Sequence, residues 1–224
     1  MPPDSVLVLA PHPDDEVLGV GGTIARLADE GRPVIVAVLT RGYPPDFAEE
    51  GTLRNREHNL RAHQILGVAE TRFLDFPAAR LDTVAHAEVN SALGALMLEL
   101  RPQRVYLPFA GDIHLDHQLA ALSAMVAARP CRASTPSAVY AYETLSETNW
   151  NAPGITPAFQ PNVFVDITEH LDTKLDAFRA FEMQVQPFPH ERSVEALEAL
   201  ARLRGATVGL RAAEAFMLLR QVVT

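Results

Sequence analysis

Cysteine and basic residues are both scarce in this chain. Cys131 is the only cysteine among 224 residues, which excludes an intrachain disulfide and favours a reducing compartment, so we expect a cytoplasmic protein. Lys and Arg number 19 against 28 Asp and Glu, and the formal net charge is -9. Because a nucleic-acid-binding surface needs a basic patch, this balance argues against nucleic acid as a partner.

Long apolar runs are missing as well. No run approaches the ~20 residues that span a bilayer, and no basic segment precedes the first apolar run, so neither a membrane span nor a secretory signal is expected. Hydrophobic residues make up 48% and charged residues 21%, as in ordinary globular proteins. The length suits one α/β domain or two small ones. Since the prolines are dispersed and no linker is evident, we expect residues 1–224 to form a single domain.

Short apolar runs alternate with amphipathic segments along the first part of the chain. Buried strands are predicted at 6–10, 33–39, 71–76 and 104–108, and helices at 22–30, 53–66, 84–100 and 118–128. This alternation predicts an α/β, Rossmann-like fold, with a mostly parallel sheet and helices on both faces. Later segments predict strands at 138–142 and 163–167 and helices at 168–184 and 193–203, while 213–223 fits either a strand or a helix.

The first polar cluster, Pro11–Glu16, directly follows the first expected strand. It holds His12, Asp14, Asp15 and Glu16 within five residues, and its three carboxylates repel one another unless a positive charge lies among them. A divalent metal is the simplest candidate. The alternative is that one of the aspartates only caps the helix that follows, which is the usual role of an Asp at such a place.

A second cluster, His114-Leu115-Asp116-His117, follows the strand expected at 104–108. The carboxyl ends of parallel strands lie at one edge of the sheet, so we expect the two clusters to meet there and form the active site. Catalytic zinc takes three protein ligands and keeps an open position. His12 and Asp15 could supply two ligands and His117 the third, which leaves one histidine to serve the substrate. Taken singly, each of these residues could equally be an exposed loop residue.

The remaining polar groups suggest hydrolytic chemistry. Asp14 and Asp15 are neighbours whose side chains should diverge, so one can hold a metal while the other acts as general base on a water molecule. Asp116 could orient an adjacent imidazole and favour its charged form, which would stabilise an oxyanion. Glu16 is expected to support the site or to form a structural ion pair.

These motifs resemble those of the PIG-L/LmbE-like family of zinc-dependent N-acetylglucosaminyl deacetylases. The resemblance rests on Pro11–Glu16 and on His114–His117, and weaker matches extend it over most of the chain: Gly21–Thr23, Arg54–Gly67, Tyr142-Glu143, Asp166–Thr168 with Lys174, and Ala213–Phe216.

The resemblance implies a role for each residue of the two motifs. The implied zinc (Zn²⁺) ligands are His12, Asp15 and His117. Asp14 would be the general base, and His114 would stabilise the oxyanion or protonate the leaving amine, oriented by Asp116.

Substrate contacts are less fully specified by the motifs. Arg54 stands where the family has an arginine that contacts a sugar or polar substituent, and Arg41 lies in the loop after the second strand. Some family members have a tyrosine two residues before the first histidine of the second motif, where this chain has Asp112. A tyrosine would then have to come from elsewhere, and the candidates are Tyr43 and Tyr142.

The function expected from the resemblance is hydrolysis of the N-acetyl group of an N-acetylglucosamine-containing small glycoside or short oligosaccharide. The partner is then a small amino-sugar substrate, with neither nucleic acid nor membrane involved. Two alternatives remain, an amidase that removes a larger acyl group from a thiol-sugar conjugate and a metal-containing binding module without turnover. The sequence leaves the oligomeric state open, a homo-oligomer included.

Overall fold

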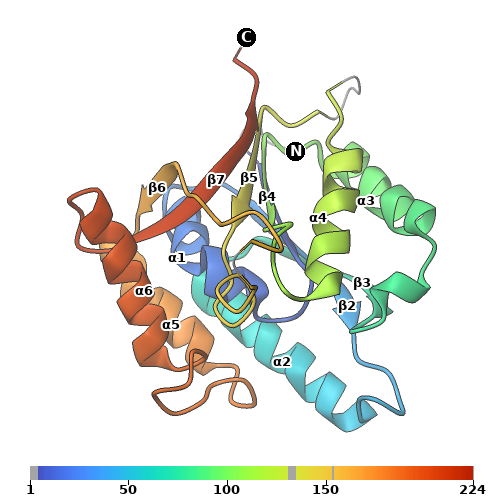
Figure 1. The fold of residues 1–224 in the computed structure, drawn as a ribbon, viewed down its shortest axis with the longest axis horizontal. Coiled ribbons are helices and arrows are strands. Elements are labelled where there is room, and N and C mark those ends of the chain that lie inside the picture. Colours follow the sequence, from blue (N-terminus) through green and yellow to red (C-terminus); the bar gives the residue numbers. More distant parts are fainter. Residues whose placement is uncertain (1–4, 131–134, 153, 224) are drawn as a thin grey trace.

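A mixed sheet lies at the centre of the computed structural model, which describes residues 5–130, 135–152 and 154–223; Cys131 lies outside these ranges. The described residues form seven strands in the order β3-β2-β1-β4-β5-β7-β6 (Figure 1). The strands are β1 (Val6–Ala10), β2 (Val34–Arg41), β3 (Glu70–Pro77), β4 (Arg104–Pro108), β5 (Ala138–Tyr142), β6 (Val163–Asp166) and β7 (Ala213–Gln221). β1 to β5 run parallel, and β7 is antiparallel to both β5 and β6.

Helices cover both faces of the sheet, as the alternating pattern predicted. One face carries α1 (Asp15–Asp29), α2 (Glu49–Leu66), α5 (Leu171–Arg179) and α6 (Val194–Thr207), and the other carries α3 (His86–Leu100) and α4 (Leu115–Ala127) (Figure 1). Short 3₁₀ turns precede α3 and α5, at Leu81–Thr83 and Thr168–His170. No helix among the described residues is long and apolar enough to cross a membrane.

The burial of β1 on both faces explains why this strand is apolar at every position. Val6, Val8 and Ala10 pack into the core under α1 and α2, whereas Leu7 and Leu9 pack into the core under α3 and α4. A central parallel strand is covered on both faces, so it needs a continuous apolar run rather than an alternating one. β1 also pairs with β4, so the loops that follow these two strands leave the same edge of the sheet.

The first helix begins seven residues earlier than predicted, at Asp15 instead of Gly22. Glycines usually weaken a helix, so the predicted start lies after Gly19 and Gly21. Tertiary packing overrides this preference, because a Cβ on Gly19 would lie 2.3 Å from a ring carbon of Tyr142, and one on Gly22 would lie 2.7 Å from Cδ1 of Ile167. The glycines therefore let α1 approach its neighbours closely.

The C-terminal third differs from the prediction in two further places. The helix expected at 168–184 is the shorter α5, and the Thr168 hydroxyl and N–H before it both donate to Asp166 Oδ1, at 2.6 and 2.9 Å. The ambiguous segment 213–223 forms the strand β7, which joins β5 to β6. When a sequence fits a strand and a helix equally well, its neighbours determine its conformation. Here the neighbours are β5 and β6, which both pair with it.

Candidate active site

The two motifs meet at the carboxyl edge of β1 and β4. His12 comes from the loop after β1, while His114 and His117 come from the start of α4. The ring centroids of His12 and His114 are 4.5 Å apart, and those of His12 and His117 are 5.3 Å apart. More than a hundred residues of sequence separate the motifs, and the parallel pairing of β1 with β4 brings them together.

His12, Asp15 and His117 form a group that could hold a metal ion, with one ligand atom from each within 4.8 Å of the others. Nε2 of His117 and Oδ1 of Asp15 are buried and have no hydrogen-bond partner among the described residues. Nδ1 of His117 contacts Asp112 Oδ2 at 2.8 Å, an arrangement that fixes the ring orientation of metal-binding histidines. Orphaned, oriented donor atoms of this kind fit a divalent cation.

The electrostatics of this group also favour a cation. His117 is flanked by two buried carboxylates, with Nε2 3.2 Å from Asp15 and Nδ1 2.8 Å from Asp112. Although burial disfavours the charged imidazolium, Asp15 raises the pKa of His117 to about 10. Conversely, although burial favours the neutral acid, His117 holds the pKa of Asp15 well below its usual range. The group thus stabilises positive charge, which a metal ion would supply in place of protons.

The predicted contact between the carboxylate of Asp116 and His114 is replaced by a different arrangement. The Asp116 carboxylate accepts from Nε2 of His12 at 3.0 Å and from the N–H groups of Ala79 and Leu81 at 2.7 and 3.1 Å. His114 is instead the N-cap of α4, and its Nδ1 accepts from the backbone N–H of Asp116 at 3.1 Å. Asp116 therefore orients His12 by its side chain and His114 by its backbone.

The capping bond determines what His114 can do. Because Nδ1 accepts a hydrogen bond, Nε2 carries the proton of the neutral ring and is available as a donor. Burial, helped by the nearby charge of His12, lowers the pKa of His114 to about 4. The charged imidazolium expected from the sequence is therefore not favoured here, and His114 offers a neutral N–H at the wall of the cavity.

Asp14 has an unusual backbone and an unexpected partner. Its φ of 116° lies in the left-handed region, which costs a non-glycine residue of the order of 1–3 kcal/mol. Its buried carboxylate accepts from Nη1 of Arg192 at 2.7 Å. Burial raises the pKa of Asp14 to about 7, and Arg192 acts in the opposite direction. A carboxylate with a pKa near neutrality suits a general base.

Arg192 and the partners of Glu16 are site residues that the sequence did not reveal. Arg192 lies 178 residues from Asp14, in the loop before α6, and no motif marks it. Glu16 is fully buried and accepts from Asn59 at 2.8 Å and from His63 at 3.1 Å. The spacing of Asn59 and His63, one turn apart on α2, is the only signal that could have identified them.

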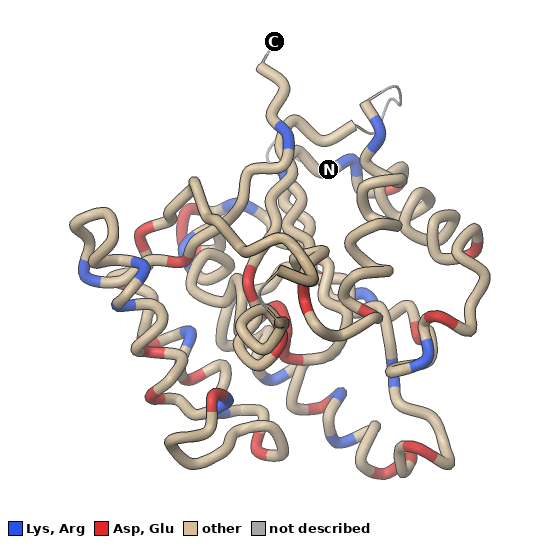
Figure 2. The backbone as a smooth tube through the Cα atoms, in the orientation of Figure 1, with Lys and Arg blue, Asp and Glu red and all other residues tan. Residues whose placement is uncertain are grey.

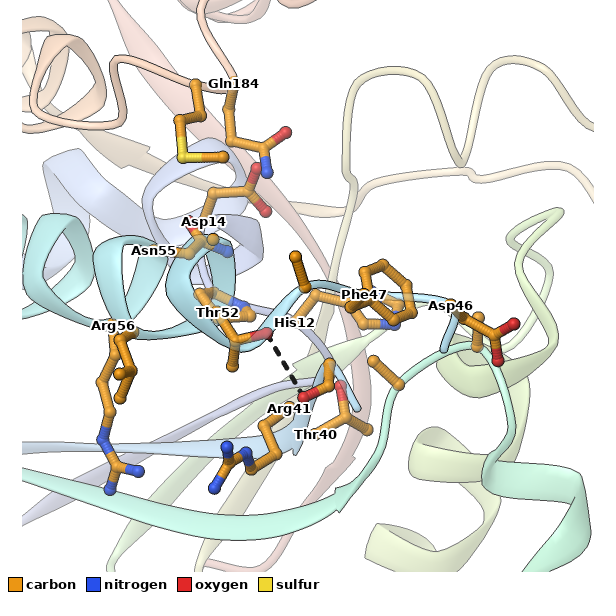
Figure 3. A pocket seen from close by; sticks show the side chains of 18 of the residues that line it. His12, Asp14, Thr40, Arg41, Asp46, Phe47, Thr52, Asn55, Arg56 and Gln184 are labelled. Carbon is orange, nitrogen blue, oxygen red and sulfur yellow. Dashed lines mark hydrogen bonds between the residues drawn. The ribbon is translucent and has the colours of Figure 1, made fainter. Parts of the chain in front are cut away.

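A cavity of about 510 Å³ opens in front of His12 and Asp14 (Figure 3), and His114 also lines it. Other parts of its wall come from the end of β2 and the loop that follows it, the first half of α2, the end of β3, Glu147 after β5 and the loop that carries Arg192. This volume lies within the ~300–1,000 Å³ that is typical of small-molecule sites.

The two predicted substrate contacts differ in their placement. Arg41 lines the cavity, so its predicted contact with the substrate stays a prediction. Arg54 points away from it, because its guanidinium pairs with Glu50 on the exposed side of α2 and its side chain is 54% exposed. The residues of α2 that line the cavity include Asn55 and Arg56. At about 3.6 residues per turn, these two lie on a different side of the helix from Arg54.

Neither candidate for the missing tyrosine reaches the reaction centre. Tyr142 is fully buried and its hydroxyl donates to the carbonyl of Leu9 at 2.8 Å. The hydroxyl of Tyr43 donates to the carbonyl of Asp75 at 2.9 Å. Asp112, which stands at the tyrosine position, contacts His117.

Comparison with known proteins identifies the family. Residues 7–128 match the family described as PIG-L: GlcNAc-PI de-N-acetylase. The chain belongs to the PIG-L family. Among relatives of this PIG-L protein, the diacetylchitobiose deacetylase of Thermococcus kodakarensis is 31% identical over 219 residues, which cover 93% of this chain and 80% of that protein. The resemblance drawn from the two motifs is thereby confirmed.

Solved structures show the same fold. The N,N'-diacetylchitobiose deacetylase of Pyrococcus horikoshii superposes with a TM-score of 0.77 at 26% identity, covering 96% of this chain and 84% of that one. The 4-carboxy-2-hydroxymuconate hydratase GalB of Pseudomonas putida superposes with a TM-score of 0.76 at 23% identity, covering 99% and 98%. Because the fold also carries a hydratase, the reaction of this PIG-L protein has to be argued from its site residues.

Proposed function

We propose that this PIG-L family member is a zinc-dependent hydrolase that removes the N-acetyl group from an N-acetylglucosamine unit of a small glycoside or short oligosaccharide. Support comes first from a group that could hold a metal ion, His12, Asp15 and His117, which lies beside Asp14 and His114 near one wall of a cavity. It comes also from relatives that are named as deacetylases of diacetylchitobiose and of N-acetylglucosaminyl conjugates.

His12, Asp15 and His117 are the residues that would hold the metal. Two imidazoles and one carboxylate form a donor set typical of catalytic zinc, which also keeps a position open. When bound, such a metal acidifies water and polarises a carbonyl group. Asp112 and Asp116 keep the rings of His117 and His12 in place, with contacts of 2.8 and 3.0 Å.

The protein's own groups then carry the protons. Asp14 accepts a proton from the attacking water, and Arg192 fixes the position of the Asp14 carboxylate. The Nε2–H of His114 donates to the amide oxygen as negative charge develops on it. Asp14 returns its proton to the departing nitrogen, so that the amide and one water yield acetate and a free amine.

We further propose that residues 1–224 act as a single domain in the cytoplasm, on a small amino-sugar substrate and without a nucleic-acid partner. The seven described strands form one sheet, and both motifs lie on it. The single cysteine supports the cytoplasmic location, and the net charge of -9 argues against a nucleic-acid partner.

A mass-spectrometric screen of N-acetylglucosamine conjugates tests the proposed reaction. We expect loss of one acetyl group from at least one neutral glycoside, loss of that activity with a chelator, and its recovery when zinc is added. An Asp14→Asn variant is the matched control for contaminating activity. Faster turnover of an acetyl-lysine peptide than of every acetylated amino sugar would contradict the substrate class.

A further inference from the structure

The arginines that line the cavity are already paired with carboxylates. The pairs are Arg41 with Glu49 at 2.6 Å, Arg56 with Asp75 at 3.4 Å, and Arg192 with Asp14 at 2.7 Å. Figure 2 shows the same intermixing on a larger scale, with basic and acidic positions interspersed along the outer helices. The cavity therefore offers guanidinium donors without an excess of positive charge.

Arg56 is held in place by an aromatic ring and a carboxylate, both on β3. Its guanidinium carbon lies 3.8 Å from the ring centroid of Phe73, and its Nη1 donates to Asp75 Oδ1. Figure 3 shows Arg41 and Arg56 both pointing away from Asp14, and both residues line the cavity. A group bound here would belong to the part of the substrate beyond the acetylated sugar.

The rest of this wall is largely apolar. Phe47, Leu53 and Met183 line the cavity and are 40%, 52% and 47% exposed, so a ligand could cover them. A pyranose ring has an apolar face and a rim of hydroxyl groups. The apolar face of such a ring can pack on these side chains while its hydroxyls form hydrogen bonds with the paired arginines and carboxylates.

We propose that Asp75, by neutralising Arg56, is a specificity-determining residue that makes this site select N-acetylglucosamine glycosides with an uncharged second unit over those that carry a carboxylate or phosphate. The inference rests on the proposed deacetylase function. It narrows the substrate to neutral glycosides and assigns the discrimination to an ion pair at the end of β3.

The physical reason is that the Arg56–Asp75 ion pair interacts favourably with a hydroxyl group and unfavourably with an anionic group. A hydroxyl can accept from Arg56 and donate to Asp75, so it satisfies both partners. An anion must share the guanidinium with the Asp75 carboxylate, which repels it, and it must also lose its hydration. Rejection by a fixed like charge is a common source of specificity.

Asp75→Asn is a suitable test because it removes the negative charge with little change in shape. Asp75 has a φ of 56°, and asparagine tolerates this left-handed conformation better than most other residues. The backbone carbonyl that accepts from the Tyr43 hydroxyl is retained. The positive charge of Arg56 is then not neutralised by a carboxylate, so it can pair with an anionic group of a bound glycoside.

The experiment compares two matched glycosides of N-acetylglucosamine, one with a carboxymethyl aglycone and one with its neutral carboxamidomethyl analogue. The ratio of kcat/KM for the acid to that for the amide is measured by acetate release at fixed ionic strength. We expect a ratio well below one for the zinc-loaded wild type. Asp75→Asn should raise the ratio by about 5- to 10-fold, the effect of roughly one near-surface charge interaction.

Two further variants separate electrostatics from structural damage. Adding Arg56→Gln to Asp75→Asn should return the ratio to the wild-type range, since no unbalanced charge remains. Arg54→Gln, outside the cavity, should leave the ratio unchanged. A wild-type preference for the acid, or a ratio that Asp75→Asn does not move, would overturn the inference.

Calorimetric titration with the same two glycosides distinguishes failure of this inference from failure of the proposed function. Tighter binding of the amide without acetate release from either compound would refute the deacetylase function while supporting the charge selection. Acetate release from both with equal kcat/KM and equal affinity would support the function and refute the selection. Binding of neither glycoside would refute both.

Discussion

At the residue scale, the site divides into groups that fit a metal and groups that we propose to move protons. Nε2 of His117 is buried without a hydrogen-bond partner among the described residues, whereas the Asp14 carboxylate has a firm one in Arg192. Neighbouring positions in one motif, Asp14 and Asp15, therefore have different surroundings. Substitutions at the two should separate metal content from activity.

Asp14→Asn should retain zinc and lower kcat by about 10²-fold or more, because an amide cannot accept the proton of water. His117→Ala should instead lower the zinc content itself, since it removes one of three ligand atoms. Elemental analysis and acetate release on the same preparations check both. Full zinc in purified His117→Ala, or near wild-type turnover by Asp14→Asn, would contradict these assignments.

Arg56→Ala and Arg54→Ala form a matched pair on one helix. Arg56 lines the cavity and Arg54 does not, so we expect Arg56→Ala to lower kcat/KM by about 10-fold and Arg54→Ala to leave it within about 2-fold. Both variants should keep their zinc. A larger loss with Arg54→Ala would restore the role expected for it from the family motif.

At the scale of single elements, α1 is the helix whose packing matters most. It carries Asp15 in its first turn, and its glycines allow close approach to neighbouring elements. The position of the loop that carries His12 and Asp14 therefore depends on the packing of this helix.

Gly22→Ala should destabilise the protein despite the better helix propensity of alanine. The added Cβ would lie within 2.9 Å of three side-chain carbons of Ile167, and overpacking of this kind costs about 1–3 kcal/mol. Gly51→Ala in α2 is the control, because the nearest atom to its Cβ, Cε of Met183, is 3.9 Å away. That variant should be neutral or slightly more stable in urea unfolding. Equal effects of the two substitutions would refute the packing argument.

At the scale of the whole molecule, one buried ion pair links the two ends of the chain. Lys174 is the only lysine in the sequence, and its Nζ lies 2.5 Å from Glu214 on β7 and 2.8 Å from the carbonyl of Leu18. Glu214 also accepts from the N–H groups of Gly22 and Thr23 in α1. The C-terminal strand thus fixes the helix that begins at the active site.

Glu214→Gln should lower the free energy of unfolding by about 3–5 kcal/mol, since it leaves the Lys174 ammonium buried without a charged partner. Glu198→Gln breaks an exposed pair with Arg202 and should cost under about 1 kcal/mol. Denaturant unfolding of the two variants gives the comparison. A loss for Glu214→Gln no larger than that of the control would show that the buried pair contributes little.

The sequence alone determined the fold class and brought together the residues that could hold a metal ion. Continuous apolar runs such as Val6–Ala10 predict buried parallel strands, and the ends of such strands share one edge. His12, Asp15 and His117 could be grouped on that ground, because a parallel sheet leaves little choice about where its loops meet.

Only the tertiary structure decided the contacts that depend on helix phase or on distant segments. Arg56 rather than Arg54 faces the cavity because of the rotation of α2, which a polar helix with a weak apolar stripe does not specify in its sequence. Arg192 meets Asp14 across 178 residues, and the Asp116 carboxylate turns to His12 instead of His114. Local sequence patterns encode periodicity and capping, whereas such contacts depend on how separate elements pack against one another.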